Sequence, residues 1–114
     1  MTLRPLRTGR FPANEPAAVL DYEIAQEQAA ALGRMGRALE RALAALSAFE
    51  STSPSGKAAR SALVQAASDA LWHFIVQREA SGLRDARQVM RDYHVPAEVQ
   101  ARMGASVGKP RSQA

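Results

Sequence analysis

The sequence contains no cysteine, few aromatic residues and no long apolar run. Without cysteine the chain cannot form disulfides, thiolate zinc sites or a cysteine nucleophile. Its apolar runs are far shorter than the roughly 20 residues that a membrane-spanning helix needs. The N-terminus is basic but is interrupted by prolines and is followed by no apolar segment, unlike a secretory signal. We therefore expect a cytoplasmic protein.

Motifs of the common enzyme classes are also missing. The chain has no Gly-x-Ser-x-Gly, P-loop or Gly-x-Gly-x-x-Gly motif, which hydrolases and nucleotide-binding proteins use. Its two histidines, His73 and His94, form no His-x-x-x-His pair, and only Asp69 lies one helical turn from His73. Ordinary helix neighbours show the same spacing. We predict no catalytic residue, no cofactor, no metal site and no enzyme activity.

Positive charge is concentrated at the two ends of the chain. The net charge is +4, whereas the central part is nearly neutral. We predict a basic N-terminal arm at residues 1–14, a helical domain at 15–104 and a disordered tail at 105–114. Such arms either contact nucleic acid or anionic membrane without specificity, or are simply solvated. The basic residues of the two ends are Arg4, Arg7, Arg10, Lys109 and Arg111.

Two long helices are predicted on either side of a clear break. Nothing interrupts a helix from residue 15 to about Phe49, and Asn14 is its candidate N-cap. The break is Ser51–Gly56, and because it is short, the second helix, Lys57–Ala80, should run back antiparallel. Apolar residues of the first helix recur every three or four positions, so they share one face. They are Ile24, Leu32, Met35, Leu39, Leu43, Leu46 and Phe49.

Two features of these helices bear on their packing. Gly33 and Gly36 either kink the first helix or allow another helix to approach closely. The first helix also carries acidic residues in its N-terminal half and mainly basic ones later, the order that the helix dipole prefers. In the second helix Trp72 and Val76 lie opposite the main apolar face, which predicts a central helix covered on both sides. That main face consists of Leu63, Ala67, Ala70, Leu71 and Phe74.

The C-terminal part is predicted to form two short helices. Ser81-Gly82 ends the second helix. A third helix should run over residues 83–93, with Ser81 as its candidate N-cap. Pro96 then starts a fourth helix through Met103, with Gly104 as its stop. The predicted fold is therefore all-α: a long antiparallel helical hairpin with one or two short C-terminal helices packed across it, over Trp72 and Val76.

The densest polar cluster lies at the corner between the second and third helices, and consists of Arg78, Glu79, Arg84 and Asp85. Two interpretations are open: a pocket for an anionic ligand, with the arginines as donors, or a corner held by Arg–carboxylate pairs. We favour the structural interpretation and expect these pairs to be partly buried.

Residues 89–104 have the helix, turn and helix outline of a DNA-reading unit. Its reading segment would offer only Gln100 and Arg102 to bases, and it also carries Glu98. Reading helices normally present several basic or amide side chains in their first turns. Nucleic-acid binding is therefore kept as the alternative function.

Several short motifs together resemble a family of short bacterial proteins known as a domain of unknown function. The resemblance covers roughly residues 18–104 and implies a helical protein, without any activity, cofactor or site residue. The motifs are Tyr22-Glu23-Ile24, Gly33-Arg34, Gly36-Arg37, residues 72–79 (WHFIVQRE), residues 82–85 (GLRD) and residues 92–96 (DYHVP).

The leading functional hypothesis is a non-enzymatic protein that acts by association, as a homodimer. The first predicted helix is longer than the second, and the last two are short. Part of its apolar stripe should then be uncovered, and an exposed stripe of this kind marks an interface.

Overall fold

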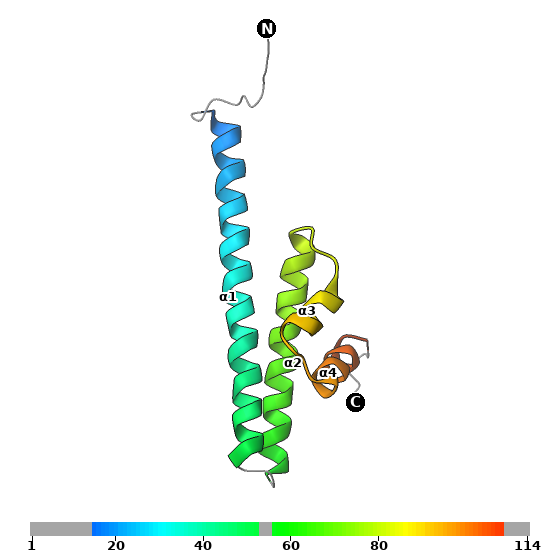
Figure 1. The fold of residues 1–114 in the computed structure, drawn as a ribbon. Helices are drawn as coiled ribbons and strands as arrows, with labels where there is room; N and C mark the ends of the chain where they lie inside the picture. The colour runs from blue at the N-terminus through cyan, green and yellow to red at the C-terminus, as the bar shows by residue number, and fades with distance from the viewer. Residues whose placement is uncertain (1–14, 53–55, 109–114) are drawn as a thin grey trace. The chain divides into compact units, whose positions relative to one another are not determined.

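The structure, a computed structural model, describes residues 15–52 and 56–108. The chain divides into two compact units, Met1–Ala31 and Leu32–Ala114. None of the described residues forms a strand. The helices are α1 (Pro16–Thr52), α2 (Lys57–Ala80), α3 (Ala86–Asp92) and α4 (Ala97–Gly108) (Figure 1). This arrangement confirms the predicted all-α hairpin with short helices packed across it.

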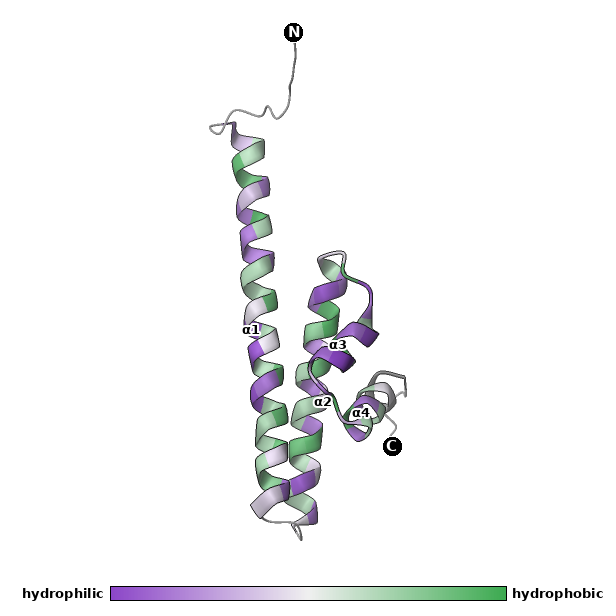
Figure 2. Ribbon diagram, viewed as in Figure 1, coloured by the Kyte–Doolittle hydropathy of each residue, from purple (hydrophilic) through white to green (hydrophobic). Residues whose placement is uncertain are grey.

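The second unit has a continuous apolar core to which all four helices contribute. The C-terminal part of α1 and α2 run side by side, and their apolar residues lie mainly on the facing sides (Figure 2). Burying an aliphatic side chain of this size contributes about 1.5–3 kcal/mol. The core residues are Leu39, Leu46, Val64, Ala67, Leu71, Phe74, Ile75, Val89, Val95 and Val99.

The short helices do not cover the face of α2 that the sequence predicted. Trp72 and Val76 are 39% and 41% exposed, so the prediction that α3 and α4 pack over them is wrong. α4 instead crosses α2 at Ser68, which is buried and donates a hydrogen bond to the carbonyl of Val99 at 3.1 Å. A small side chain allows this close crossing, and the hydrogen bond offsets the cost of burying its hydroxyl. The covered face of α2 comprises Val64, Ser68, Leu71 and Ile75.

The break between α1 and α2 is shorter than predicted. Helix α1 continues through Thr52, because the hydroxyls of Ser51 and Thr52 donate to backbone carbonyls one turn earlier. Residues 53–55 and the predicted cap Asn14 lie outside the described residues. Helix α2 has its predicted bounds and ends in a Schellman motif. There Gly82 has a φ of 91°, and the Leu83 N–H donates to the Arg78 carbonyl.

The two short helices differ from prediction at their ends. Helix α3 begins at Ala86 rather than residue 83, with Asp85 and not Ser81 as its N-cap. Helix α4 runs past the predicted stop at Gly104 and ends at Gly108. A glycine ends a helix when it adopts a positive φ, whereas Gly104 does not have one. Residues 105–108 are therefore helical, and the rest of the predicted tail, 109–114, lies outside the described residues.

Helix α3 ends in a second Schellman motif, with His94 where glycine is usual. His94 has a φ of 52°, and the Val95 N–H donates to the Met90 carbonyl at 3.0 Å. A non-glycine residue in this conformation costs roughly 1–2 kcal/mol. The core position of Val95 and the start of α4 hold the chain in this turn.

The two glycines of α1 have different surroundings. Both lie within continuous helix, and Gly36 is the site of close approach. A Cβ at Gly36 would lie 2.8 Å from the Tyr93 hydroxyl and 3.5 Å from the Phe74 ring, whose centroid is 5.4 Å from that of Tyr93. A Cβ at Gly33 would meet only the Arg37 guanidinium of its own helix. Gly36 thus seats α3 against the hairpin.

Replacing Gly36→Ala should destabilise the protein by about 1–2 kcal/mol, because the new methyl group displaces Tyr93 from its edge-on contact with Phe74. The matched change Gly104→Ala adds a methyl group where nothing lies within 4 Å. It should instead stabilise α4 by about 0.5–1 kcal/mol. Thermal unfolding followed by circular dichroism checks both changes. Equal stabilisation by the two would contradict the close approach at Gly36.

Candidate interaction surface

The polar corner predicted from the sequence is organised by backbone contacts. The Asp85 carboxylate accepts a hydrogen bond from the Arg87 N–H at 3.1 Å and so caps α3. Arg78 donates to the backbone carbonyl of Asp85 at 3.4 Å, and its guanidinium lies 5.8 Å from the centre of the Phe74 ring. These contacts join the end of α2 to the start of α3.

The predicted Arg–carboxylate pairs do not form at this corner. Glu79, Arg84 and Asp85 are exposed, and the ion pairs of the described residues lie elsewhere. The expectation of partly buried pairs is therefore wrong, because the Asp85 carboxylate turns toward the N-terminus of α3.

Asp85→Ala should destabilise the protein by about 1 kcal/mol, the usual loss for an N-cap. Asp85→Asn removes the same charge but keeps a capping oxygen, so its melting temperature should stay near that of the wild type. Calorimetry of the two variants distinguishes a cap from an ion pair. If both variants lost the same stability, the charge would matter and the capping role would be refuted.

The side chains that would read bases on α4 are bound within the protein. The Gln100 amide donates to the carbonyl of Val95 at 3.0 Å, and Arg102 donates to the Gln65 side chain of α2 at 3.2 Å. Glu98 pairs with Arg60. These contacts argue against base reading by α4. The N-terminal basic arm lies outside the described residues.

An ion-pair network at the hairpin end was not foreseen. Arg60 on α2 binds Glu50 at the end of α1 and Glu98 at the start of α4, with distances of 2.7 and 2.8 Å to the two Glu98 oxygens. The hydrogen bonds to Glu98 and then Glu50 raise the pKa of Arg60, and the bond from Arg60 lowers the pKa of Glu98. The partners lie 10 and 38 positions from Arg60, so no local pattern indicates the network.

The stabilisation from Glu98 should depend on pH. Since pairing lowers its pKa, the contribution is complete above about pH 4.5, the ordinary pKa of glutamate, and is lost as pH falls through the lower folded value. Glu98→Gln should therefore lower the melting temperature by more at pH 7 than at about pH 3. Glu79→Gln, at an exposed site, should match wild type at both pH values. A Glu98→Gln deficit of the same size at both would contradict the pairing.

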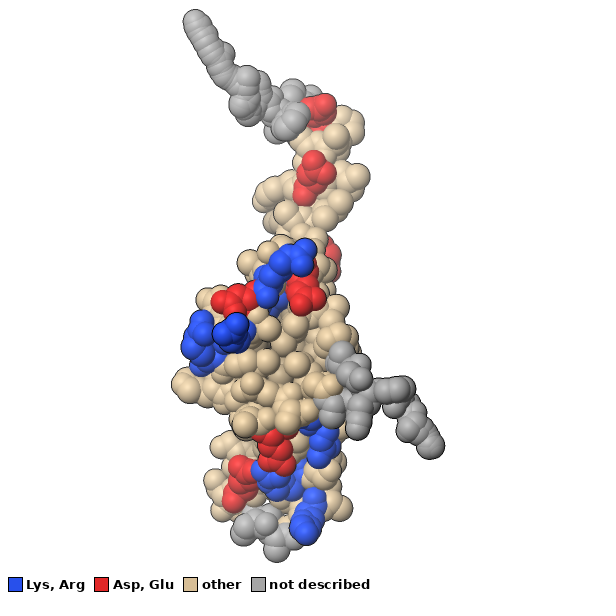
Figure 3. Space-filling model, turned by 90° about the vertical axis from the view of Figure 1, so that its right-hand side faces the viewer, with Lys and Arg blue, Asp and Glu red and all other residues tan. Residues whose placement is uncertain are grey.

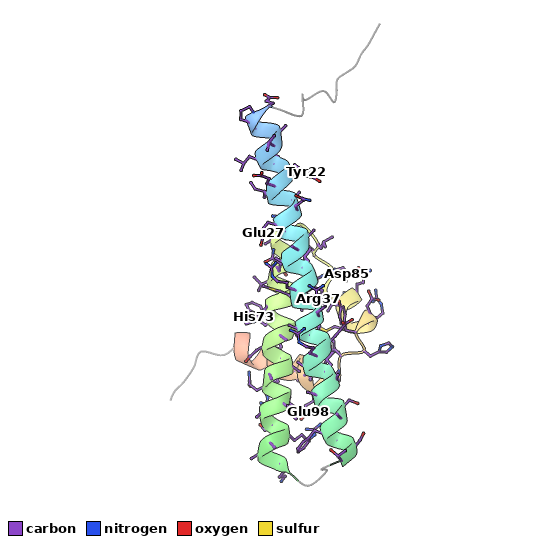
Figure 4. All side chains as sticks on the ribbon, turned by 90° about the vertical axis from the view of Figure 1, so that its left-hand side faces the viewer. Tyr22, Glu27, Arg37, His73, Asp85 and Glu98 are labelled. Carbon is purple, nitrogen blue, oxygen red and sulfur yellow. The ribbon has the colours of Figure 1, made fainter. Side chains whose placement is uncertain are left out.

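A shallow groove of about 520 Å³ runs between α1 and α2 in the second unit. Three of its seven lining residues are alanines, and three are polar or charged. Figure 4 labels His73 on α2 and Arg37 on α1. The alanines are small residues at helical spacing, a sequence pattern that is equally typical of buried packing. The groove, as we call it below, is lined by Arg34, Met35, Ala38, Ala66, Asp69, Ala70 and His73.

The exposed apolar residues of α2 adjoin this groove. Trp72 lies three positions after Asp69, and Val76 lies three after His73, so each is one helical turn from a groove residue. Asp69 and His73 thus lie between the alanines of the groove and these two exposed apolar side chains.

The N-terminal part of α1, Pro16–Ala31, belongs to the first compact unit. Large apolar side chains are exposed there: Leu20 by 56%, Tyr22 by 64% and Ile24 by 49%. Ile24, a member of the predicted apolar face of the first helix, is thus exposed in this segment. The charged residues of this segment are all acidic, and Figure 3 shows acidic side chains along these turns.

The described residues contain no group of three or more histidine, aspartate or glutamate side chains placed to hold a metal ion. Within residues 15–52 and 56–108, every helix is too short or too polar to cross a membrane.

Comparison with known proteins gives a family but no activity. Residues 7–111 match the model of a family described as "Family of unknown function (DUF6665)". No curated protein and no solved structure matches the chain. The resemblance inferred from the short motifs is thus confirmed as membership of a family of unknown function, over a longer stretch than residues 18–104.

Proposed function

We propose that this chain, which belongs to the family of unknown function, is a non-enzymatic protein that acts by associating with a second copy. The observation that carries the proposal is the exposure of Leu20 and Ile24, which lie one turn apart on the same side of α1. Single exposed apolar residues are ordinary, whereas a cluster of this kind marks an interface. The non-enzymatic part rests on the missing motifs.

Helix energetics support this proposal. Most helices in proteins are stabilised mainly by packing an apolar face against the rest of the structure. In Pro16–Ala31 the large apolar side chains are instead 38–64% exposed. Association through this segment supplies the missing packing, and a two-fold symmetric pair supplies it to both copies at once.

The full-length chain at micromolar concentration should have twice the mass of one chain by light scattering or sedimentation. Leu20→Gln combined with Ile24→Gln should shift the mass to that of one chain, because two exposed apolar side chains leave the interface. Leu83→Gln is the matched control, since Leu83 is 46% exposed at the polar corner, and this variant should keep the dimer mass. A wild-type chain that is monomeric throughout this range would refute the proposal.

A further inference from the structure

We infer that residues 109–114 of this chain, which lie outside the described residues, dock on one side of α2 and cover Trp72 there. Five residues of that side recur every three or four positions, so they form one stripe along the helix. The inference goes beyond the proposed function, because the docked segment and the stripe belong to the same chain. The Trp72 stripe, as we call it below, consists of Gln65, Asp69, Trp72, Val76 and Glu79.

The centre of the Trp72 stripe is apolar and is left uncovered by the described helices. Trp72 is 39% exposed and Val76 is 41% exposed. The indole ring of tryptophan is a large apolar surface, and its face is the best aromatic partner for a lysine or arginine side chain. A segment that carries basic side chains can therefore bind here through both its apolar and its charged groups.

Both ends of the apolar centre are acidic. Asp69 and Glu79 are exposed, and residues 61–77 contain no lysine or arginine. The Asp69 carboxylate accepts a hydrogen bond from the Gln65 amide at 2.9 Å, and a carboxylate has room for further donors. The segment has the opposite charge, since residues 99–114 contain no aspartate or glutamate and residues 109–114 include Lys109 and Arg111. The two charge patterns are thus complementary.

Helix α4 leads the chain to this side of α2. It crosses α2 at Ser68, on the side next to the Trp72 stripe (Figure 1). Further along α4, Arg102 donates a hydrogen bond to the Gln65 side chain at 3.2 Å, so α4 reaches the first residue of the stripe. The helix ends at Gly108. Residue 109 therefore begins on the side of α2 that carries the stripe.

The length of the segment suits the distance that it must cover. From Val99 at the crossing, α4 continues to Gly108, a rise of about 14 Å at 1.5 Å per residue. Trp72 lies only one turn of α2 beyond Ser68. Three extended residues after Gly108 span up to about 10 Å, and the long side chain of Arg111 extends this reach. The segment can therefore return over Trp72 and act as a strap on the stripe.

Trp72 is the single tryptophan of the chain, so its fluorescence reports on the strap alone. In the full-length chain, Lys109→Glu combined with Arg111→Glu should raise the quenching constant for acrylamide about twofold, because the ring loses its cationic cover. Emission should shift to longer wavelength at the same time. In 1 M salt the wild type should become as accessible as this variant, since salt screens the exposed charges.

Reversing the charge of the stripe gives the complementary variant. Asp69→Lys combined with Glu79→Lys, with the wild-type segment, should be quenched as strongly as the segment variant. All four changes together restore opposite charges and should restore the shielding of Trp72. The matched control, Arg84→Glu with Arg87→Glu, changes the charge by the same amount at exposed sites outside the stripe and should behave as the wild type. Circular dichroism verifies that every variant is helical.

The outcomes distinguish this inference from the proposed function. Equal quenching of the wild type and the segment variant would overturn the strap, as would a fourfold variant that stays open. Shielding that disappears on hundredfold dilution of the wild type would assign the segment to a second copy and would also overturn it. A wild type that is monomeric yet shielded would refute the association and leave the strap intact.

Discussion

The crossing of α4 over α2 at Ser68 determines which surfaces of this protein are available. Once the Ser68 hydroxyl binds the Val99 carbonyl, α4 occupies the side of α2 that carries Val64, Leu71 and Ile75. Helix α1 takes the neighbouring side, and α3 is seated against both through Gly36. The side of α2 with Trp72, Val76 and His73 is then left to solvent. This side of α2 stays exposed because α1, α3 and α4 pack on its other sides.

Local signals were sufficient for most of the helices. The Ser/Pro/Gly break before Lys57 predicted the start of α2, and Gly82 predicted its end. Both signals act within about one turn of the chain. The start of α3 was missed by three residues, since Ser81 and Asp85 are both good caps and the sequence does not say which is used. The structure uses Asp85 as the cap. Arg78 of α2 donates a hydrogen bond to the backbone carbonyl of Asp85 and so holds this residue at the start of α3.

Long-range choices could not be made from the sequence. Helix α2 has two apolar faces, and hydrophobicity alone ranked Trp72 and Val76 above Ser68, whereas size and hydrogen bonding placed Ser68 inside. The Arg60 network joins residues from three helices, so its members have no fixed spacing. The candidate surface was foreseen in kind, as an uncovered apolar part of the first helix. The groove between α1 and α2 was not predicted, because alanines at helical spacing are equally typical of buried packing.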